Sequence, residues 1–240
     1  MNRIVLYRES PSPCEYLPHE SAQLLYGTAP HLLPSQYSEL LRAGWRRFGS
    51  NVFRPDCPSC RKCLSLRVPV AAFRPSRTQR RIWKHHTGEV QVRIGTPCLT
   101  LERLEVYRAF HEHGHLTKGW PDRSAEDRRE GASGLGVFLA NPFATEEWSY
   151  WIGDRLAGVG YVDVLDEGLS AIYFFHDPRD ARRSLGTVNI LHLIEAARQR
   201  GLPHVYLGYY VEGCRSLEYK ARFGPKEVLN ERGEWVQFPV

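Results

Sequence analysis

The sequence predicts an α+β protein in which a mixed, mostly antiparallel sheet is flanked by helices and preceded by a smaller α+β unit that contains cysteines. Three strand-like segments follow one another between residues 147 and 177, separated by turn sequences such as "GDR" and "DEG". A helical repeat of apolar residues then fills residues 184–201. Of the 240 residues, 42% are apolar and 25% are charged, a composition able to bury a sizeable core. We therefore expect two units, at residues 1–88 and 89–240.

The first unit surrounds a loop that is rich in cysteine. We expect strands at residues 3–9, 45–55 and 64–73, and helices at residues 34–44 and 75–86. Ser35 lies near the start of the first helix and Gly44 just beyond its end. Pro75 or Ser76 begins the second helix, which is strongly basic.

The second unit has a different order of elements. We expect strands at residues 89–95, 147–154, 156–165, 169–177 and 204–210, and helices at residues 100–114, 184–201 and 214–224. Thr100 and Gly114 are the expected N-cap and stop of the first helix, and Ser184 and Gly201 have these roles in the longest one. Ser124 is expected to begin a further short helix. This order is that of the GNAT-type acyltransferases, an analogy at the level of fold.

The net charge and the apolar segments limit the class of protein. Lys and Arg number 32 against 27 Asp and Glu, and the resulting charge of +5 permits a polyanionic partner without requiring one. No stretch approaches the roughly 20 apolar residues of a membrane span, and the N-terminal residues lack a signal-peptide core. We expect a cytoplasmic protein without a membrane partner, in which cysteines stay reduced.

Three cysteines recur at a spacing that suits metal ligation. Cys57, Cys60 and Cys63 are each separated by two residues, and Cys14 is the best fourth candidate within the same unit. Thiolates in such runs hold a structural zinc ion or an iron–sulfur cluster. The alternative is a reduced loop that only holds two strands together. Catalysis by Cys60 is disfavoured, because no obvious His–acid pair accompanies it.

Basic residues gather at three places. On a helix, Arg77, Arg80, Arg81 and Lys84 share one face, and Trp83 beside them is able to stack on a base. Further clusters are Arg46 with Arg47, and Arg179 with Arg182 and Arg183. Each cluster alone is consistent with a solvated surface, but the three together favour a polyanionic partner.

The segment "RRSLGT" lies where a GNAT fold binds phosphate, at the N-terminus of the longest helix. Acyl-CoA enzymes normally place a glycine-rich R/Q-x-x-G-x-G/A run there, and this chain has only Gly186. The difference disfavours CoA and favours another phosphate-bearing acyl donor. Tyr209 ends the strand where such folds do chemistry, and Lys220 and Arg222 on the next helix are candidates for a substrate carboxylate.

With these features, the chain resembles the arginyl-tRNA–protein transferase family, and most of all its bacterial aspartate/glutamate leucyltransferases. The resemblance rests on "CEYLPHESAQLLY", "LLRAGWRRFGSNVFRPDCPSCRKCLSLRVPV", "FRPSRTQRR", "YFFHDP", "SLGTVNILHLIEAA" and "LPHVYLGYYVEGCRSLEYKARFGP", together with Glu227 and Trp235. It implies transfer of an amino acid from charged tRNA to the N-terminus of a protein that begins with Asp or Glu, which marks that protein for degradation. Eukaryotic relatives use arginyl-tRNA and place their cysteines differently, as adjacent pairs.

On this interpretation each candidate residue has an expected role. Arg77 and Arg80, with Lys220 or Arg222, bind the acidic side chain of the acceptor. The aminoacyl-tRNA is bound by Arg46, Arg47, Ser184, Leu185, Gly186 and Thr187, and the residues nearest the reacting atoms are Tyr173, Asp177 and Tyr209. Asp177 is the candidate proton relay. The chemistry needs no cofactor, because an α-ammonium with a pKa of about 7.7–8 loses its proton readily.

Three alternatives remain at the level of sequence. The amino acid transferred is leucine or arginine, which physical reasoning alone does not decide. An acetyl-CoA-dependent GNAT N-acetyltransferase would need CoA affinity, which "RRSLGT" does not favour. A zinc-dependent nucleic-acid-binding module would need the cysteines and would show no turnover.

Overall fold

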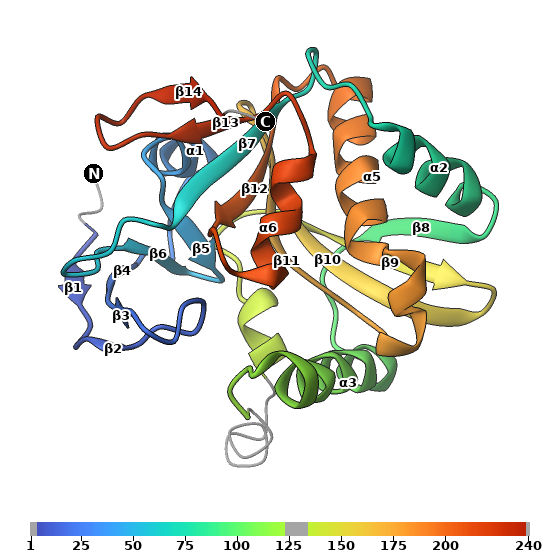
Figure 1. Ribbon diagram of the computed structural model, residues 1–240, viewed down its shortest axis with the longest axis horizontal. Helices are drawn as coiled ribbons and strands as arrows, with labels where there is room; N and C mark the ends of the chain where they lie inside the picture. The colour runs from blue at the N-terminus through green and yellow to red at the C-terminus, as the bar shows by residue number, and fades with distance from the viewer. Residues whose placement is uncertain (1–3, 123–133, 239–240) are drawn as a thin grey trace.

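The computed structural model describes residues 4–122 and 134–238, and its centre is an eight-stranded sheet (Figure 1). In spatial order this large sheet contains β14 (Trp235–Gln237), β13 (Glu227–Leu229), β7 (Leu64–Pro69), β12 (His204–Tyr210), β11 (Gly168–His176), β10 (Arg155–Leu165), β9 (Thr145–Ile152) and β8 (Val90–Gly95). Its neighbouring strands are antiparallel except β11 and β12, which are parallel. The prediction of a mixed, mostly antiparallel sheet is confirmed.

A smaller sheet is built from the N-terminal part of the chain. Its strands are β1 (Leu6–Arg8), β4 (Leu24–Thr28), β6 (Asn51–Pro55) and β5 (Arg46–Phe48), and β2 (Ser12–Pro13) pairs separately with β3 (Ser21–Ala22). The single strand expected at residues 45–55 is therefore wrong, because β5 and β6 form a hairpin in which Phe48 opposes Asn51.

The strand β7 joins the N-terminal part of the chain to the large sheet. It pairs with β12 on one side and with β13 on the other. The residues on either side of position 88 thus share one sheet, and the expected division into two units stays a prediction.

Helices cover both faces of the large sheet (Figure 1). They are α1 (Pro34–Arg42), α2 (Arg77–His86), α3 (Leu101–Lys118), α5 (Leu185–Gln199) and α6 (Arg215–Glu218), with 3-10 turns η1 (Gly134–Phe138), η2 (Pro178–Arg183) and η3 (Tyr219–Arg222). The largest core cluster packs α5 against the sheet, and a second, on the other face, packs α3 and η1 against β10 and β11. α2 lies beside α5. No described helix is long and apolar enough to cross a lipid bilayer.

The ends of the helices show where sequence signals suffice. Thr100 is an N-cap, as predicted, and of the two candidates Pro75 and Ser76 the N-cap of α2 is Ser76; both side chains accept hydrogen bonds, from the N–H groups of Arg103 and Gln79. Gly114 as the stop of α3 is wrong, because the helix continues to Lys118. The indole ring of Trp120 instead packs directly on Gly114. A β-carbon at this position would lie 1.9 Å from the ring, so a larger residue would displace the indole.

Two further expectations concern Ser positions. Ser184 is the N-cap of α5, but its side chain makes no capping hydrogen bond and its backbone is left-handed, with φ 55°. The short helix expected to begin at Ser124 lies outside the described residues. The last expected helix, at residues 214–224, is a single turn of α6 followed by η3.

Candidate functional site

The two parallel strands of the large sheet separate after a short common stretch. β11 and β12 pair only at Gly168 with His204, Leu169 with Val205, and Ser170 with Tyr206. Beyond these pairs, residues 171–176 of β11 and 207–210 of β12 diverge, and we call this region the fork. Carbonyl groups that face the fork need partners from elsewhere.

Two cations supply those partners. Arg46 on β5 is buried and donates to the hydroxyl of Ser170, at 3.3 Å, and to the carbonyl of Ala171. The Nζ atom of Lys220 donates to the carbonyl of Tyr209, at 3.3 Å. A β-carbon at Gly208 would lie 3.7 Å from both Nη2 of Arg46 and Nζ of Lys220. The two positive groups therefore occupy the fork together, against the backbone of β12.

The two fork cations have no ion-pair partner in the described part of the chain, although the charge of Asp163, which pairs with Arg47, also attracts Arg46. No described carboxylate lies within ion-pair distance of Arg46 or Lys220. Burial, and next the neighbouring charge of Arg46, lower the pKa of Lys220 to about 7. A pair of partly buried cations without a counter-ion favours binding of an anion, and a carboxylate fits two adjacent donors.

The N-terminus of α5 lies next to the fork through η3. A β-carbon at Gly186 would lie 3.3 Å from the hydroxyl oxygen of Tyr219, the residue before Lys220. Burial raises the pKa of Tyr219 to about 12, so its phenol keeps its proton and remains a hydrogen-bond donor. The first N–H groups of a helix have no partner within it and attract anions. Residues 184–187 thus lie beside Tyr219, and their predicted role in binding the aminoacyl-tRNA stays a prediction.

Arg47 is not available to RNA, and this prediction is wrong. Its side chain is buried in an ion pair with Asp163, and its Nε lies 2.8 Å from a carboxylate oxygen. The remaining N–H groups bind the carbonyl of Gly49, at 2.7 Å, the amide oxygen of Asn141, at 2.9 Å, and the hydroxyl of Thr145, at 2.7 Å. Arg47 therefore connects the small sheet to β10.

The side chain of Tyr209 has a structural partner, and its predicted place near the reacting atoms stays a prediction. Its hydroxyl donates to the carbonyl of Gly44, at 3.1 Å, and burial raises its pKa well above the usual value. Only the Tyr209 backbone reaches the fork, through the bond to Lys220. Tyr173 lies in the aromatic cluster against α3, with its hydroxyl 2.9 Å from Nε2 of His111, and its role stays a prediction.

Asp177 is a structural residue and not a proton relay. Its buried carboxylate accepts from the N–H of Arg179, at 2.9 Å, and pairs with the side chains of Arg179 and Arg155. Burial by itself would raise the pKa of Asp177. The hydrogen bonds from Arg179 and the positive charges of Arg179 and Arg155 outweigh this effect, so the pKa of Asp177 is lowered. A carboxylate held ionised in this way is a weak base, so the proton-relay prediction is wrong.

Of the basic residues predicted to bind the acceptor, Lys220 alone has its charged group in the fork. Arg77 and Arg80 are exposed on α2, and the carbonyl of Arg222 accepts a hydrogen bond from Gln79 of the same helix, at 3.0 Å.

Arg46, which we assigned to tRNA, instead lies beside Lys220. We assigned no role to Tyr219 from the sequence, because a tyrosine after an acidic residue carries no distinguishing signal.

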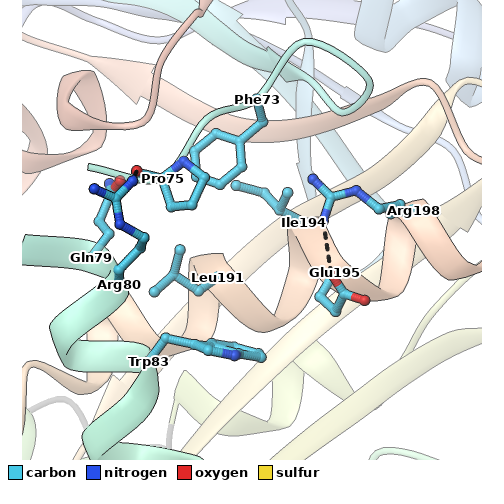
Figure 2. A pocket seen from close by; sticks show the side chains of 9 residues that line it. All are labelled: Phe73, Pro75, Gln79, Arg80, Trp83, Leu191, Ile194, Glu195 and Arg198. Carbon is cyan, nitrogen blue, oxygen red and sulfur yellow. Dashed lines mark hydrogen bonds and ion pairs between the residues drawn. The ribbon is translucent and has the colours of Figure 1, made fainter. Parts of the chain in front are cut away.

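A hollow of about 290 Å³ separates α2 from α5, and Figure 2 shows its lining. The residues that line it are Phe73, Pro75, Gln79, Arg80, Trp83, Leu191, Ile194, Glu195 and Arg198. Arg80 lies at one edge of the hollow, and its guanidinium donates a hydrogen bond to the carbonyl of Pro75, at 2.7 Å. Arg198 lies at the other edge and forms an ion pair with Glu195, at 2.9 Å. An apolar floor with an indole and two guanidinium groups suits a planar base with an attached phosphate.

The cysteine loop packs behind β12. Cys14 and Cys63 contact the cluster that contains Tyr209 and Val211. Burial, and next the nearby thiols of Cys57, Cys14 and Cys60, raise the pKa of Cys63 to about 12. The four predicted ligands lie in one region of the molecule, but among the described residues no three of their sulfur atoms come within 4.8 Å of one another, so the side chains would have to move to hold a zinc ion or a cluster. Metal binding by the loop stays a prediction.

Comparison with known proteins decides the family. The model of the arginine-tRNA-protein transferase N terminus matches residues 12–81, and the model of its C terminus matches residues 102–230. The chain belongs to the arginine-tRNA-protein transferase family. This confirms the resemblance noted from the sequence.

Relatives of this transferase family match along almost the whole chain. The aspartate/glutamate leucyltransferase of Chromobacterium violaceum is 36% identical, over 98% of this chain and 95% of that protein. The protein of the same name from Pseudomonas aeruginosa strain PAO1 is 37% identical, over 98% and 97%. Among solved structures, L-PGS from Bacillus licheniformis has a TM-score of 0.44 and 12% identity, over 65% of this chain and 49% of that one.

The reassignment of Arg47 in this transferase leads to a prediction about stability. Arg47→Met leaves Asp163 buried without its partner, and we expect it to lower the free energy of unfolding by about 3–5 kcal/mol. Chemical denaturation measures the change. The control is Arg81→Met on the exposed face of α2, which we expect to change stability by less than about 0.5 kcal/mol. Equal stability of both variants would contradict the structural role of Arg47.

Proposed function

We propose that the protein transfers leucine from leucyl-tRNA to the α-amine of proteins that begin with Asp or Glu. Membership of the transferase family and the names of its relatives support this activity. The amine nitrogen attacks the ester carbonyl that joins leucine to the tRNA 3′ end. An amide bond forms, the ester bond breaks, and the ribose hydroxyl leaves with a proton. We also propose that the added leucine marks the acceptor protein for degradation in the cytoplasm.

The fork is the proposed acceptor site, and its two adjacent cations are the observation that carries the proposal. Arg46 and Lys220 would bind the side-chain carboxylate of Asp or Glu and so hold the adjacent α-amine. A neutral first residue would leave the cations without a counter-ion, which is a strong basis for discrimination. In this arrangement Arg46 replaces Arg77 and Arg80 as the partner of Lys220.

The aminoacylated end of the tRNA is proposed to lie at the N-terminus of α5. Residues 184–187 would contact the 3′ end, and the phenol of Tyr219 is placed to donate to the oxyanion of the tetrahedral intermediate. The exposed cations of α2, among them Arg77 and Arg80, would hold phosphates, and the neighbouring hollow would take a base. This geometry supports a GNAT-like acyltransferase domain.

The N-terminal cysteine-bearing part is proposed as a brace behind the acceptor site. Cys14, Cys57, Cys60 and Cys63 would hold a structural zinc ion or an iron–sulfur cluster. Such a group would stabilise the loop behind Tyr209, and the acyl transfer needs no cofactor, because the acceptor amine is a sufficient nucleophile near neutral pH.

A transfer assay tests the activity directly. The protein is incubated with labelled leucyl-tRNA, arginyl-tRNA or acetyl-CoA, and with peptides that begin with Asp, Glu or Ala. We expect label from leucyl-tRNA on the Asp and Glu peptides only. Transfer from arginyl-tRNA would identify an arginyltransferase, and transfer only from acetyl-CoA, or none, would overturn the proposal.

Removal of one fork cation tests the acceptor site. For Lys220→Met we expect kcat/KM for the Asp peptide to fall about 100-fold, because Arg46 and the carboxylate lose a charged partner. The KM for leucyl-tRNA should change less than about twofold. The matched control is Lys62→Met, a half-exposed lysine paired with Glu20, which should leave both constants unchanged. Equal losses for peptide and tRNA would place Lys220 in the tRNA site instead.

The lowered pKa of Lys220 predicts a pH dependence of acceptor binding. The free enzyme loses the Lys220 charge as the pH rises through about 7, whereas the acceptor carboxylate stays ionised. We therefore expect the KM for the Asp peptide to rise with pH above 7, by up to about tenfold per unit. Lys220→Arg, whose guanidinium stays charged, should remove this rise. The same slope in both enzymes would show that another group titrates.

A further inference from the structure

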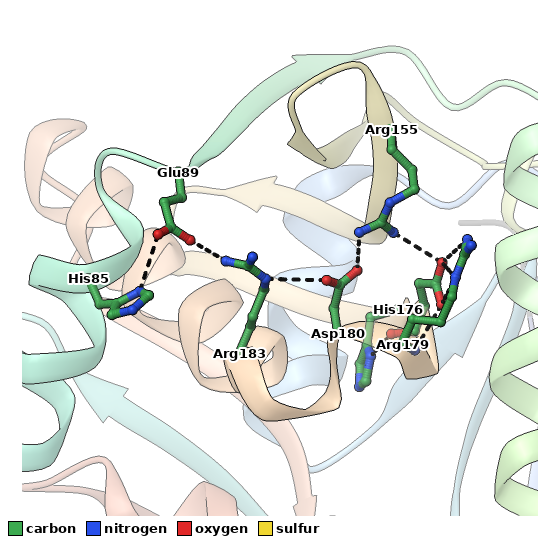
Figure 3. A network of polar contacts seen from close by, with 8 residues as sticks. His85, Glu89, Arg155, His176, Arg179, Asp180 and Arg183 are labelled. Carbon is green, nitrogen blue, oxygen red and sulfur yellow. Dashed lines mark hydrogen bonds and ion pairs between the residues drawn. The ribbon is translucent and has the colours of Figure 1, made fainter.

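Two histidines and a glutamate meet where α2 ends and β8 begins. His85 and His86 are the last residues of α2, and Glu89 directly precedes β8. One ligand atom of each side chain lies within 4.8 Å of the others. Nδ1 of His85 is 3.9 Å from Oε1 of Glu89, as Figure 3 shows. None of these residues has a role in the proposed transfer reaction.

His86 provides an independent indication of a ligand. Its side chain is only 5% exposed, and its Nδ1 is buried without a hydrogen-bond partner in the described structure. The ring lies against the backbone of Arg183. A buried imidazole nitrogen that lacks a hydrogen-bond partner is available to a metal ion.

The two carboxylate oxygens of Glu89 face different residues, Arg183 and His85. Its Oε2 accepts a hydrogen bond from Arg183, whereas its Oε1 faces His85. Arg183 also pairs with Asp180, with Nε at 3.3 Å from the carboxylate (Figure 3). One oxygen of Glu89 is thus oriented by an arginine, and the other points to the histidines. This is the usual support that a ligating carboxylate receives from its surroundings.

We propose that His85, His86 and Glu89 form a binding site for a divalent transition-metal ion of the zinc class. Two imidazoles and one carboxylate are a common zinc donor set, with water as the fourth ligand. Nitrogen donors disfavour Ca²⁺ and Mg²⁺, which prefer oxygen. The exposed His85 and Glu89 side chains are free to close on an ion that the buried His86 fixes.

The site would connect α2 to the N-terminus of α5. Arg183 binds Glu89 and directly precedes Ser184, the N-cap of α5. An ion on His85, His86 and Glu89 would fasten the end of α2 to this turn. Favourable interaction of His85 and His86 with the helix dipole is a simpler explanation of their presence, but it does not account for the unpaired nitrogen of His86.

Metal titration of the full-length protein tests the proposal. We expect calorimetry to detect one Zn²⁺ site that Glu89→Gln and His85→Ala each weaken at least about tenfold. The matched control is His31→Ala, an exposed histidine outside the cluster, which should bind Zn²⁺ like the parent protein. Saturating Zn²⁺ should raise the Tm of the parent by about 5 °C, and of Glu89→Gln by much less.

Cobalt distinguishes this site from the cysteine loop. Co²⁺ bound by nitrogen and oxygen gives d–d absorption without the charge-transfer band of a cobalt thiolate. We expect Cys57→Ser to remove any thiolate band and to leave the nitrogen and oxygen signal. Metal binding that is unchanged in Glu89→Gln and His85→Ala, or that disappears in Cys57→Ser, would overturn the proposal. Both cluster variants are at exposed positions, and circular dichroism verifies that they fold.

Discussion

The buried ion pair between Arg47 and Asp163 fixes the small sheet against the large one, and the position of Arg46 in the fork depends on it. Arg47 lies on β5 and Asp163 on β10, and neither side chain is exposed to solvent. A fully hydrogen-bonded pair of this kind tolerates little displacement, since each lost contact leaves a buried charge. β5 is therefore held at one register, and the preceding residue, Arg46, is placed to donate to the carbonyl of Ala171 on β11.

The fork combines a favourable and an unfavourable arrangement of charge. Arg46 and Lys220 bind strand carbonyls that β11 and β12 cannot offer to each other once the strands diverge. The same placement brings two positive groups together in partial burial, which depresses the pKa of Lys220. In the proposed function, the acidic acceptor relieves this repulsion. Specificity for Asp or Glu would then arise because only an acidic side chain relieves the repulsion between Arg46 and Lys220 that is present in the free enzyme.

The large sheet explains why the N-terminal and C-terminal parts of the chain work as one body. β7 comes from the N-terminal part but lies between β12 and β13 from the C-terminal part. The helix α2 that follows β7 packs beside α5, and Gln79 of α2 binds the backbone of Arg222 after Lys220. The basic helix α2 and the diverging strands β11 and β12 thus belong to one arrangement around a single sheet (Figure 1), and the hollow lies between α2 and α5.

The sequence by itself determined most elements, the cap at Thr100, the family, and Lys220 as a candidate for the acidic acceptor. These follow from local periodicity, capping chemistry and motifs, which need no knowledge of distant residues. Only the tertiary structure decided that Arg46 faces the fork whereas Arg47 binds Asp163, that the hydroxyl of Tyr209 binds Gly44, and that Asp177 holds two arginines. Neighbouring residues of one type are equivalent in a sequence pattern. Burial and a distant partner give each of them a separate role.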